Sequence, residues 1–527
     1  MQNREWMDRI TAEWLEWSWI WNQLTPLSPQ GKAHKKNLKP FFKGQEVEWQ
    51  AEIERTKKLE ELLQQEKRAE MEEAFTKLKD PSFFIQLLQK GEAGAETDWF
   101  HLKQFLWEVR KLFHYLGSMD TELASSLDKV EQLIQILAAD QSSFALSDFS
   151  KRLQEYHQEK VRANLALQQI TEERKQRLEE ELALSFQGTH LFVSLKDQRR
   201  VEQCLQHKEL MKVRETPFEM VFSLSPSQEE KAFHEQIEEM ERAIAAEEKS
   251  CLEALLKAFT PYLQDLEQWN RWVGEWDWRW TKFTWLLNEE RSWPVLDPRK
   301  IHIQQGRYLP LEKRLQKEGK LYTPLSVELE YGLTTLVGSN MGGKSVTLKT
   351  MALLVALAHY ALPVPARSFC MSLVERMVAI HGDQENIEEG VSTFGSEMLR
   401  LAEYVHGHHQ LFLMDELARG TNPQEGEVLA LALAEHMARE KTQLCVMVTH
   451  FSRLSALSEA KHYRVVGLEA EGHMNYVLVE NEEQDVPRHA LIMAEKLGVP
   501  TEIIKRAHDL LEEGESHGAI RSGSEQN

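Results

Sequence analysis

One glycine-rich stretch constrains the fold of this chain more than any other feature. Residues 333–337 are apolar or β-branched and predict a buried strand, while a helix is expected to begin near Lys344. The residues at this junction complete the pattern Gly-x-x-x-x-Gly-Lys-Ser: Gly338, Ser339, Asn340, Met341, Gly342, Gly343, Lys344 and Ser345. A chance match occurs in about one in fifty random chains of similar length, and the flanking strand and helix reduce that chance further. The stretch therefore predicts a phosphate-binding loop.

The chemistry of such a loop gives each part a role. Backbone N–H groups in a turn that glycine permits point at phosphate oxygens, and the positive end of the following helix adds to their attraction. Lys344 is expected to reach the β- and γ-phosphates of ATP, and the Ser345 hydroxyl is expected to bind Mg²⁺.

Two later apolar runs end in residues that suit ATP hydrolysis. The run 410–414 predicts a buried strand with Asp415 and Glu416 at its carboxyl end, where open α/β sheets bind their ligands. Asp415 is expected to serve Mg²⁺, and Glu416 to polarise the attacking water. The run 444–448 ends near His450, which we interpret as a sensor of the γ-phosphate in preference to a structural histidine.

These motifs together resemble the MutS family of DNA mismatch-repair ATPases. The resemblance rests on 338–345, on the Asp-Glu-Leu-Ala-Arg-Gly-Thr run at 415–421 and on Thr-His-Phe at 449–451. It implies a Mg²⁺-dependent ATPase that works as a homodimer or as a heterodimer with a related subunit.

Two site residues follow from the resemblance alone. Residues 390–398 match the family's Ser-Thr-Phe-x-x-Glu-Met loop, which implies that Ser392 acts in trans on the nucleotide of the partner subunit. Tyr322 lies where the family places an aromatic residue before the ATPase sheet, and it is expected to stack on adenine.

The rest of the chain predicts a multidomain protein with an α-helical core, two long helices that enclose a small mixed insert, and an α/β domain. The resemblance implies that the long helices are the family's lever helices, that the insert is its clamp and that the C-terminal helices serve dimerisation. Two long amphipathic stretches, 147–184 and 228–259, suggest an antiparallel coiled-coil arm. The insert between them contains two strand-like runs, Leu191–Leu195 and Phe218–Leu224. The expected domains are a helical core (1–146), lever helices (147–262) with a clamp insert (about 186–224), a return of the core (263–300), a P-loop ATPase domain (301–487), C-terminal dimerisation helices (488–513) and a disordered tail (514–527).

Composition narrows the partners without deciding them. The formal net charge is −21, which does not favour binding of nucleic acid over the whole surface, although the clamp insert is locally basic. Its basic residues suit a solvated tip and a contact with nucleic acid about equally: Lys196, Arg199, Arg200, Lys208, Lys212 and Arg214. Four scattered cysteines and a charged N-terminus without a signal peptide favour a reduced, cytoplasmic setting with no membrane span. The histidines at 406, 408 and 409 suit a solvated turn better than a metal site.

Departures from the family leave two functions open. The proline usual after the first loop glycine is Ser339 here, and residues 422–426 read Asn-Pro-Gln-Glu-Gly. We expect no N-terminal mismatch-reading domain and no nuclease-like module. A clamp on DNA in repair or recombination is slightly favoured, and the alternative is a chaperone-like reactivase of a B12-dependent lysine aminomutase.

Overall fold

The computed structural model describes residues 6–62, 65–137, 144–338, 343–382, 393–418, 420–465, 477–481, 494 and 498–510. The chain forms two compact units. The first combines Met1–Leu27, Gly31–Arg68 and Gly274–Asn527, and the second combines Ser28–Gln30 and Ala69–Val273. No described helix has both the length and the apolar character that a membrane span requires.

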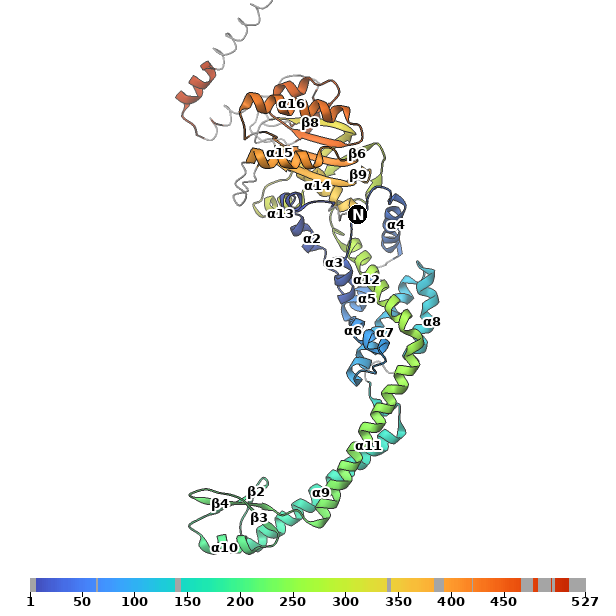
Figure 1. Ribbon diagram of the computed structural model, residues 1–527, viewed down its shortest axis with the longest axis vertical. Coiled ribbons are helices and arrows are strands. Elements are labelled where there is room, and N and C mark those ends of the chain that lie inside the picture. The colour runs from blue at the N-terminus through green and yellow to red at the C-terminus, as the bar shows by residue number, and fades with distance from the viewer. Residues whose placement is uncertain are drawn as a thin grey trace, which may run out of the picture. The chain divides into compact units, whose positions relative to one another are not determined.

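A six-stranded sheet forms the centre of the first unit (Figure 1), with the strand order β10-β11-β12-β8-β13-β14. The strands from β10 to β13 are parallel, and β14 pairs antiparallel with β13. The strands are β8 (Gly332–Val337), β10 (Arg376–His381), β11 (Gln410–Asp415), β12 (Leu444–Val448), β13 (Lys461–Val465) and β14 (Leu478–Glu480). The central strands β8, β11 and β12 are buried over nearly their whole length and consist mostly of apolar or β-branched residues, because parallel strands are covered on both faces.

Three longer helices accompany this sheet: α14 (Lys344–His359), α15 (Thr393–Tyr404) and α16 (Pro423–Arg439). Nearly every residue of α14 is buried, which explains why its sequence is apolar on all sides. The first unit also holds a four-stranded sheet of order β5-β9-β6-β7. Its strands and the neighbouring helix are β5 (Val295–Leu296), β6 (Lys300–Gly306), β7 (Leu325–Glu330), β9 (Ser368–Met371) and α13 (Leu309–Lys317).

Helices from both ends of the chain complete the core of the first unit. Trp49 of α4 (Glu46–Leu62) donates a hydrogen bond from Nε1 to the carbonyl of Ala358, 2.6 Å away, at the end of α14. Glu52, also on α4, pairs with Arg279 and Lys282 of α12 (Leu263–Thr284). Trp6, Trp49, Trp278 and Trp285 are buried in this core. The other short elements along the first unit are α1 (Arg9–Trp14), α2 (Trp17–Gln23), α3 (Pro29–Lys36), η3 (Ser452–Ala456) and a helix at 501–510.

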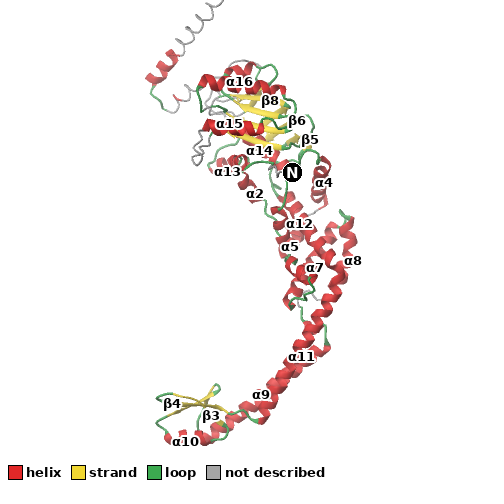
Figure 2. Cartoon of the chain, viewed as in Figure 1, coloured by secondary structure: helices red, strands yellow, loops and turns green. Residues whose placement is uncertain are grey.

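Two long helices dominate the second unit. α9 (Lys151–Leu182) and α11 (Gln228–Phe259) run side by side in opposite directions (Figure 2). We call them the lever helices. The remaining helices of this part of the chain are α5 (Gln65–Lys77), α6 (Ser82–Gln89), α7 (Glu96–Leu116), α8 (Thr121–Ile136), η1 (Leu146–Asp148) and η2 (Thr260–Tyr262).

A small sheet of order β1-β2-β4-β3 joins the lever helices at one end. The two strands expected from the sequence are present as β2 (His190–Ser194) and β4 (Glu219–Leu224). The structure adds β1 (Phe186–Gln187), α10 (Gln198–Gln206) and β3 (Leu210–Glu215). Leu178 of α9 packs in the same core as the sheet residues Leu191 and Phe222, so the sheet and the lever share one hydrophobic cluster.

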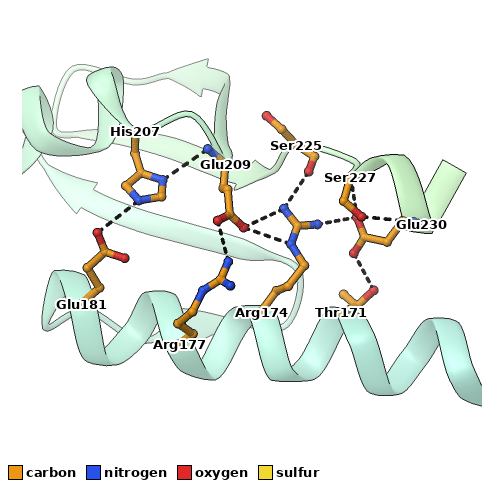
Figure 3. Close-up of polar contacts among 9 residues, drawn as sticks. All are labelled: Thr171, Arg174, Arg177, Glu181, His207, Glu209, Ser225, Ser227 and Glu230. Atoms are coloured by element: carbon orange, nitrogen blue, oxygen red, sulfur yellow. Dashed lines mark hydrogen bonds and ion pairs between the residues drawn. The ribbon is translucent and has the colours of Figure 1, made fainter.

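A polar network fixes the junction between the sheet and the lever helices (Figure 3). The guanidinium of Arg174 donates to the Glu209 carboxylate at 3.0 Å, to the Ser225 carbonyl at 3.0 Å and to the Glu230 carboxylate. We call these four residues the Arg174 joint. Burial would raise the pKa of Glu230, but hydrogen bonds from Ser227 and neighbouring side chains outweigh this effect and lower it. The joint therefore ties α9, the residue before β3 and the start of α11 together, with one cation between two carboxylates.

Candidate nucleotide site

The carboxyl ends of three parallel strands bring predicted site residues to one edge of the central sheet. The register aligns Asp415 of β11 with Val448 of β12, and Val448 with Leu336 of β8. The next amides continue this row, since Glu416 N donates to the Val448 carbonyl at 3.2 Å and Thr449 N donates to the Leu336 carbonyl at 3.1 Å. β12 thus separates the two predicted motif strands by one strand width, about 4.8 Å on each side.

The glycine-rich loop leads from β8 into α14. Residues 339–342, and with them Ser339, Asn340, Met341 and Gly342, lie outside the described residues. Gly343 caps α14 with a left-handed backbone (φ 76°), a conformation that glycine adopts without the steric cost of a Cβ atom. Gly338 precedes the loop, and Ser345 is exposed in the first turn of the helix.

Lys344 lies at the centre of the site. Its buried Nζ donates to the Gly338 carbonyl at 2.7 Å and lies 3.4 Å from Glu416 Oε1. The structure therefore brings together the lysine and the glutamate that the sequence predicts for phosphate binding and for water activation, although 72 positions separate them. Asp415 is half-buried at the end of β11, beside Glu416.

The turn after β11 has an unusual backbone. Glu416 (φ 54°) and Ala418 (φ 63°) both adopt the left-handed region, which is costly for residues with a Cβ atom. The Ala418 amide donates to Glu397 Oε2 at 2.9 Å, and Glu397 is buried on α15. Burial raises the pKa of Glu397, an effect that this hydrogen bond opposes.

A cavity of about 310 Å³ opens beside the start of α14. Tyr322 lines it together with Gly343 and Val346, and so the structure places this tyrosine next to the glycine-rich loop. The Tyr322 hydroxyl accepts a hydrogen bond from the Tyr308 amide at 2.9 Å, which fixes the ring at the cavity wall. The volume lies at the lower end of the range for small-molecule sites, and most of the lining is apolar, as a nucleobase requires. The apolar lining residues that sequence reasoning did not identify are Leu311, Leu315, Leu321 and Leu325.

Of the remaining predicted residues, the structure describes some and not others. His450 is exposed directly after β12, and its ring lies 4.3 Å from the ring of Phe451. Ser392 lies outside the described residues. In the histidine cluster, His409 contacts the Lys43 ammonium at 2.8 Å and His408 lies 3.4 Å from the Thr442 hydroxyl.

The donor atoms at this edge fit ATP and Mg²⁺. The hydroxyl of Ser345 and the carboxylate of Asp415 are oxygen donors of the kind Mg²⁺ prefers, and Lys344 supplies a cation for phosphate. In the described ranges no three His, Cys, Asp or Glu side chains form a metal cluster. Mg²⁺ binds through few protein ligands and completes its shell with water and phosphate oxygens, so the oxygen donors of Ser345 and Asp415 suit it.

Comparison with known families agrees with this geometry. Residues 334–515 match the family model of MutS domain V. The matched segment begins within β8 and includes α14, α15, β11 and β12, so it contains every loop and strand end described above except the Tyr322 wall. This part of the chain is therefore similar to the ATPase domain of MutS proteins. The second unit lies outside the matched segment.

Proposed function

We propose that this protein is a MutS-type ATPase that hydrolyses ATP with Mg²⁺. The proposal rests on the short distance between Lys344 Nζ and Glu416 Oε1, which is 3.4 Å. The two groups meet at the edge of the sheet where the loop 338–345 leads into α14. A lysine from one motif and a carboxylate from the other are the two groups that phosphoryl transfer to water needs at one place.

The proposal gives each of these side chains a role in turn. Lys344 exchanges its contacts with Gly338 and Glu416 for the β- and γ-phosphate oxygens when ATP binds. Glu416, released from the lysine, then accepts a hydrogen bond from the attacking water. Bound Mg²⁺ neutralises charge on the phosphates, and Ser345 and Asp415 are the side chains that would hold it. The cavity lined by Tyr322 receives the adenine.

The proposal extends to a dimer with two composite nucleotide sites. The resemblance of 390–398 to the family loop implies that Ser392 reaches the nucleotide of the partner chain. His450, after the strand 444–448, would sense the γ-phosphate. ATP binding then closes the two sites and hydrolysis reopens them, and the lever helices transmit the movement to the sheet at their end.

Two substrates for the moving clamp remain, and we favour DNA. The six basic side chains of the clamp insert that the sequence identifies are all exposed, so they can meet a phosphate backbone. The alternative is a protein client, as in the reactivase of a B12-dependent lysine aminomutase. The net charge of −21 supports this second role, because most of the surface would repel DNA.

ATP turnover with and without DNA tests the proposal. The purified protein is expected to hydrolyse ATP, and Lys344→Ala is expected to abolish both nucleotide binding and turnover. Duplex, mismatched and branched DNA are then added at low salt, where phosphate contacts are strongest. Stimulation of turnover supports the DNA clamp. Hydrolysis without any DNA binding rejects DNA and favours the protein client, and absence of hydrolysis rejects the ATPase itself.

A further inference from the structure

A buried glutamate next to the proposed site has no role in the mechanism above. Glu397 lies in the second turn of α15 with 2% of its surface exposed. Its Oε2 accepts the Ala418 amide proton at 2.9 Å, across 21 positions of sequence. Its Oε1 has no hydrogen-bond partner within the described part of the chain. A buried oxygen of this kind costs free energy, a cost that packing alone does not explain.

The amide that Glu397 holds belongs to the strained turn that carries Glu416. Glu416 and Ala418 are both left-handed, and Ala418 follows Glu416 by two residues. Gly420 lies near the same helix, since a Cβ atom built on it would be in ordinary van der Waals contact with Phe394 Cβ, at 3.5 Å. The first turns of α15 therefore face this turn and bond to it through the Ala418 amide.

On its other side, the Glu397 carboxylate lies near the residue that follows β10. Gly382 follows β10, and a Cβ atom placed there would approach Glu397 Oε1 to 3.1 Å. Such a distance is shorter than most real contacts, so a glycine leaves the space that Glu397 needs. Glu397 therefore lies between the residue that follows β10 and the turn that contains Ala418.

We propose that Glu397 is a positioning residue for ATP hydrolysis, because its hydrogen bond to the Ala418 amide fixes the left-handed turn that aims the Glu416 carboxylate at the attacking water. This inference deepens the proposed function and rests on it. Glu397 touches neither nucleotide nor water in this role, and acts only through the backbone of residues 416–418.

Two near-isosteric variants separate this role from simple packing. Glu397→Gln keeps an oxygen that accepts the Ala418 proton, whereas Glu397→Met has similar length and accepts no hydrogen bond of comparable strength. We expect Glu397→Met to lower kcat about tenfold while KM and the Kd for ATP stay within about twofold. Glu397→Gln is expected to retain kcat within about threefold of the unaltered protein, because the hydrogen bond survives.

Each outcome of this experiment decides the inference. Equal kcat in Glu397→Met and the unaltered protein overturns it and leaves the ATPase proposal intact. Equal loss in the Gln and Met variants also overturns it, since the hydrogen bond would then not be the cause. An unaltered protein without turnover removes both proposals. Thermal unfolding checks that the variants fold, and if Glu397→Met does not, the shorter Glu397→Asp must show the same selective loss of kcat.

Discussion

The nucleotide site and the Arg174 joint both gather charged side chains away from solvent, but they do so differently. In the joint, Arg174 is 11% exposed and meets two carboxylates and a carbonyl, while regular helix geometry continues around it. At the nucleotide site, Lys344 is held by a carbonyl and one carboxylate, and the backbone at Glu416 is left-handed. Charges that neutralise one another on unstrained backbone stabilise a fold. Charges set on strained backbone at a strand edge are arranged for a ligand.

The strongest test of this comparison removes the charge of Glu416 at the nucleotide site. Glu416→Gln keeps the size of the side chain and removes the carboxylate that would orient water. We expect turnover to fall by about 10²–10⁴-fold while ATP binding remains, since the contribution of a general base is of this order. Single-turnover hydrolysis and equilibrium binding of ATP measure the two effects separately.

A matched change distinguishes this effect from loss of any surface carboxylate. Glu459 is 61% exposed in the same unit and contacts only Arg439 at 4.0 Å among the ion pairs described. Glu459→Gln is expected to leave turnover unchanged. If Glu416→Gln hydrolysed ATP as fast as Glu459→Gln, Glu416 would have no catalytic role.

At the joint, loss of a charge should reduce stability and leave chemistry intact. Arg174→Met removes the partner of Glu209 and Glu230, and leaves the latter carboxylate buried without its cation. We expect this change to cost about 3 kcal/mol of local stability. Hydrogen exchange of the amides in β3 and β4 is the measurement, and their protection should fall by about 100-fold. ATP turnover without DNA should remain at the original rate.

Arg177 supplies the control at the joint because it pairs with the same Glu209 but is 59% exposed. An exposed pair contributes at most about 1 kcal/mol, so Arg177→Met should alter exchange far less. Equal effects of the two substitutions would show that burial of Arg174 has no special importance for the joint.

The two regions also differ in how far the sequence predicts them. Local patterns predict the loop 338–345, the pair Asp415 and Glu416, and the strands β2 and β4. Apolar runs and glycines act on their immediate neighbours, so these features can be recognised from short stretches of sequence. Contacts between distant positions do not follow in this way. Arg174 meets Glu230 across 56 positions, and only the antiparallel arrangement of the lever helices brings them together.

Two features of the structure were harder to identify for other reasons. Strand β3 escaped prediction because all but one of its residues are exposed and its register shifts between Lys212 and Arg214, so it lacks a clean alternation. Glu397 lies inside a matched motif, yet its role depends on the backbone angles of Ala418, which no spacing of residue types reveals. The sequence offered one signal, the glutamate of the motif at 390–398. The structure identifies the Ala418 amide as its hydrogen-bond partner.

The smallest expected effect concerns Tyr322 in the wall of the cavity. We expect this residue to combine a structural contact through its hydroxyl with a ligand contact through its ring. The Tyr322 hydroxyl accepts the Tyr308 amide proton, while the ring lines the cavity beside Gly343. Tyr322→Phe removes the hydroxyl and keeps the ring, so it should cost about 1 kcal/mol of stability with little change in ATP affinity. Tyr322→Ala also removes the ring, and we expect the Kd for ATP to rise about tenfold, as stacking on a base contributes roughly 1–3 kcal/mol.

Calorimetric titration of ATP and of inorganic triphosphate separates the causes, because triphosphate has no base and should bind both variants equally. A Tyr322→Ala protein that loses affinity for ATP and triphosphate alike would show that the tyrosine supports the start of α14 and does not contact adenine.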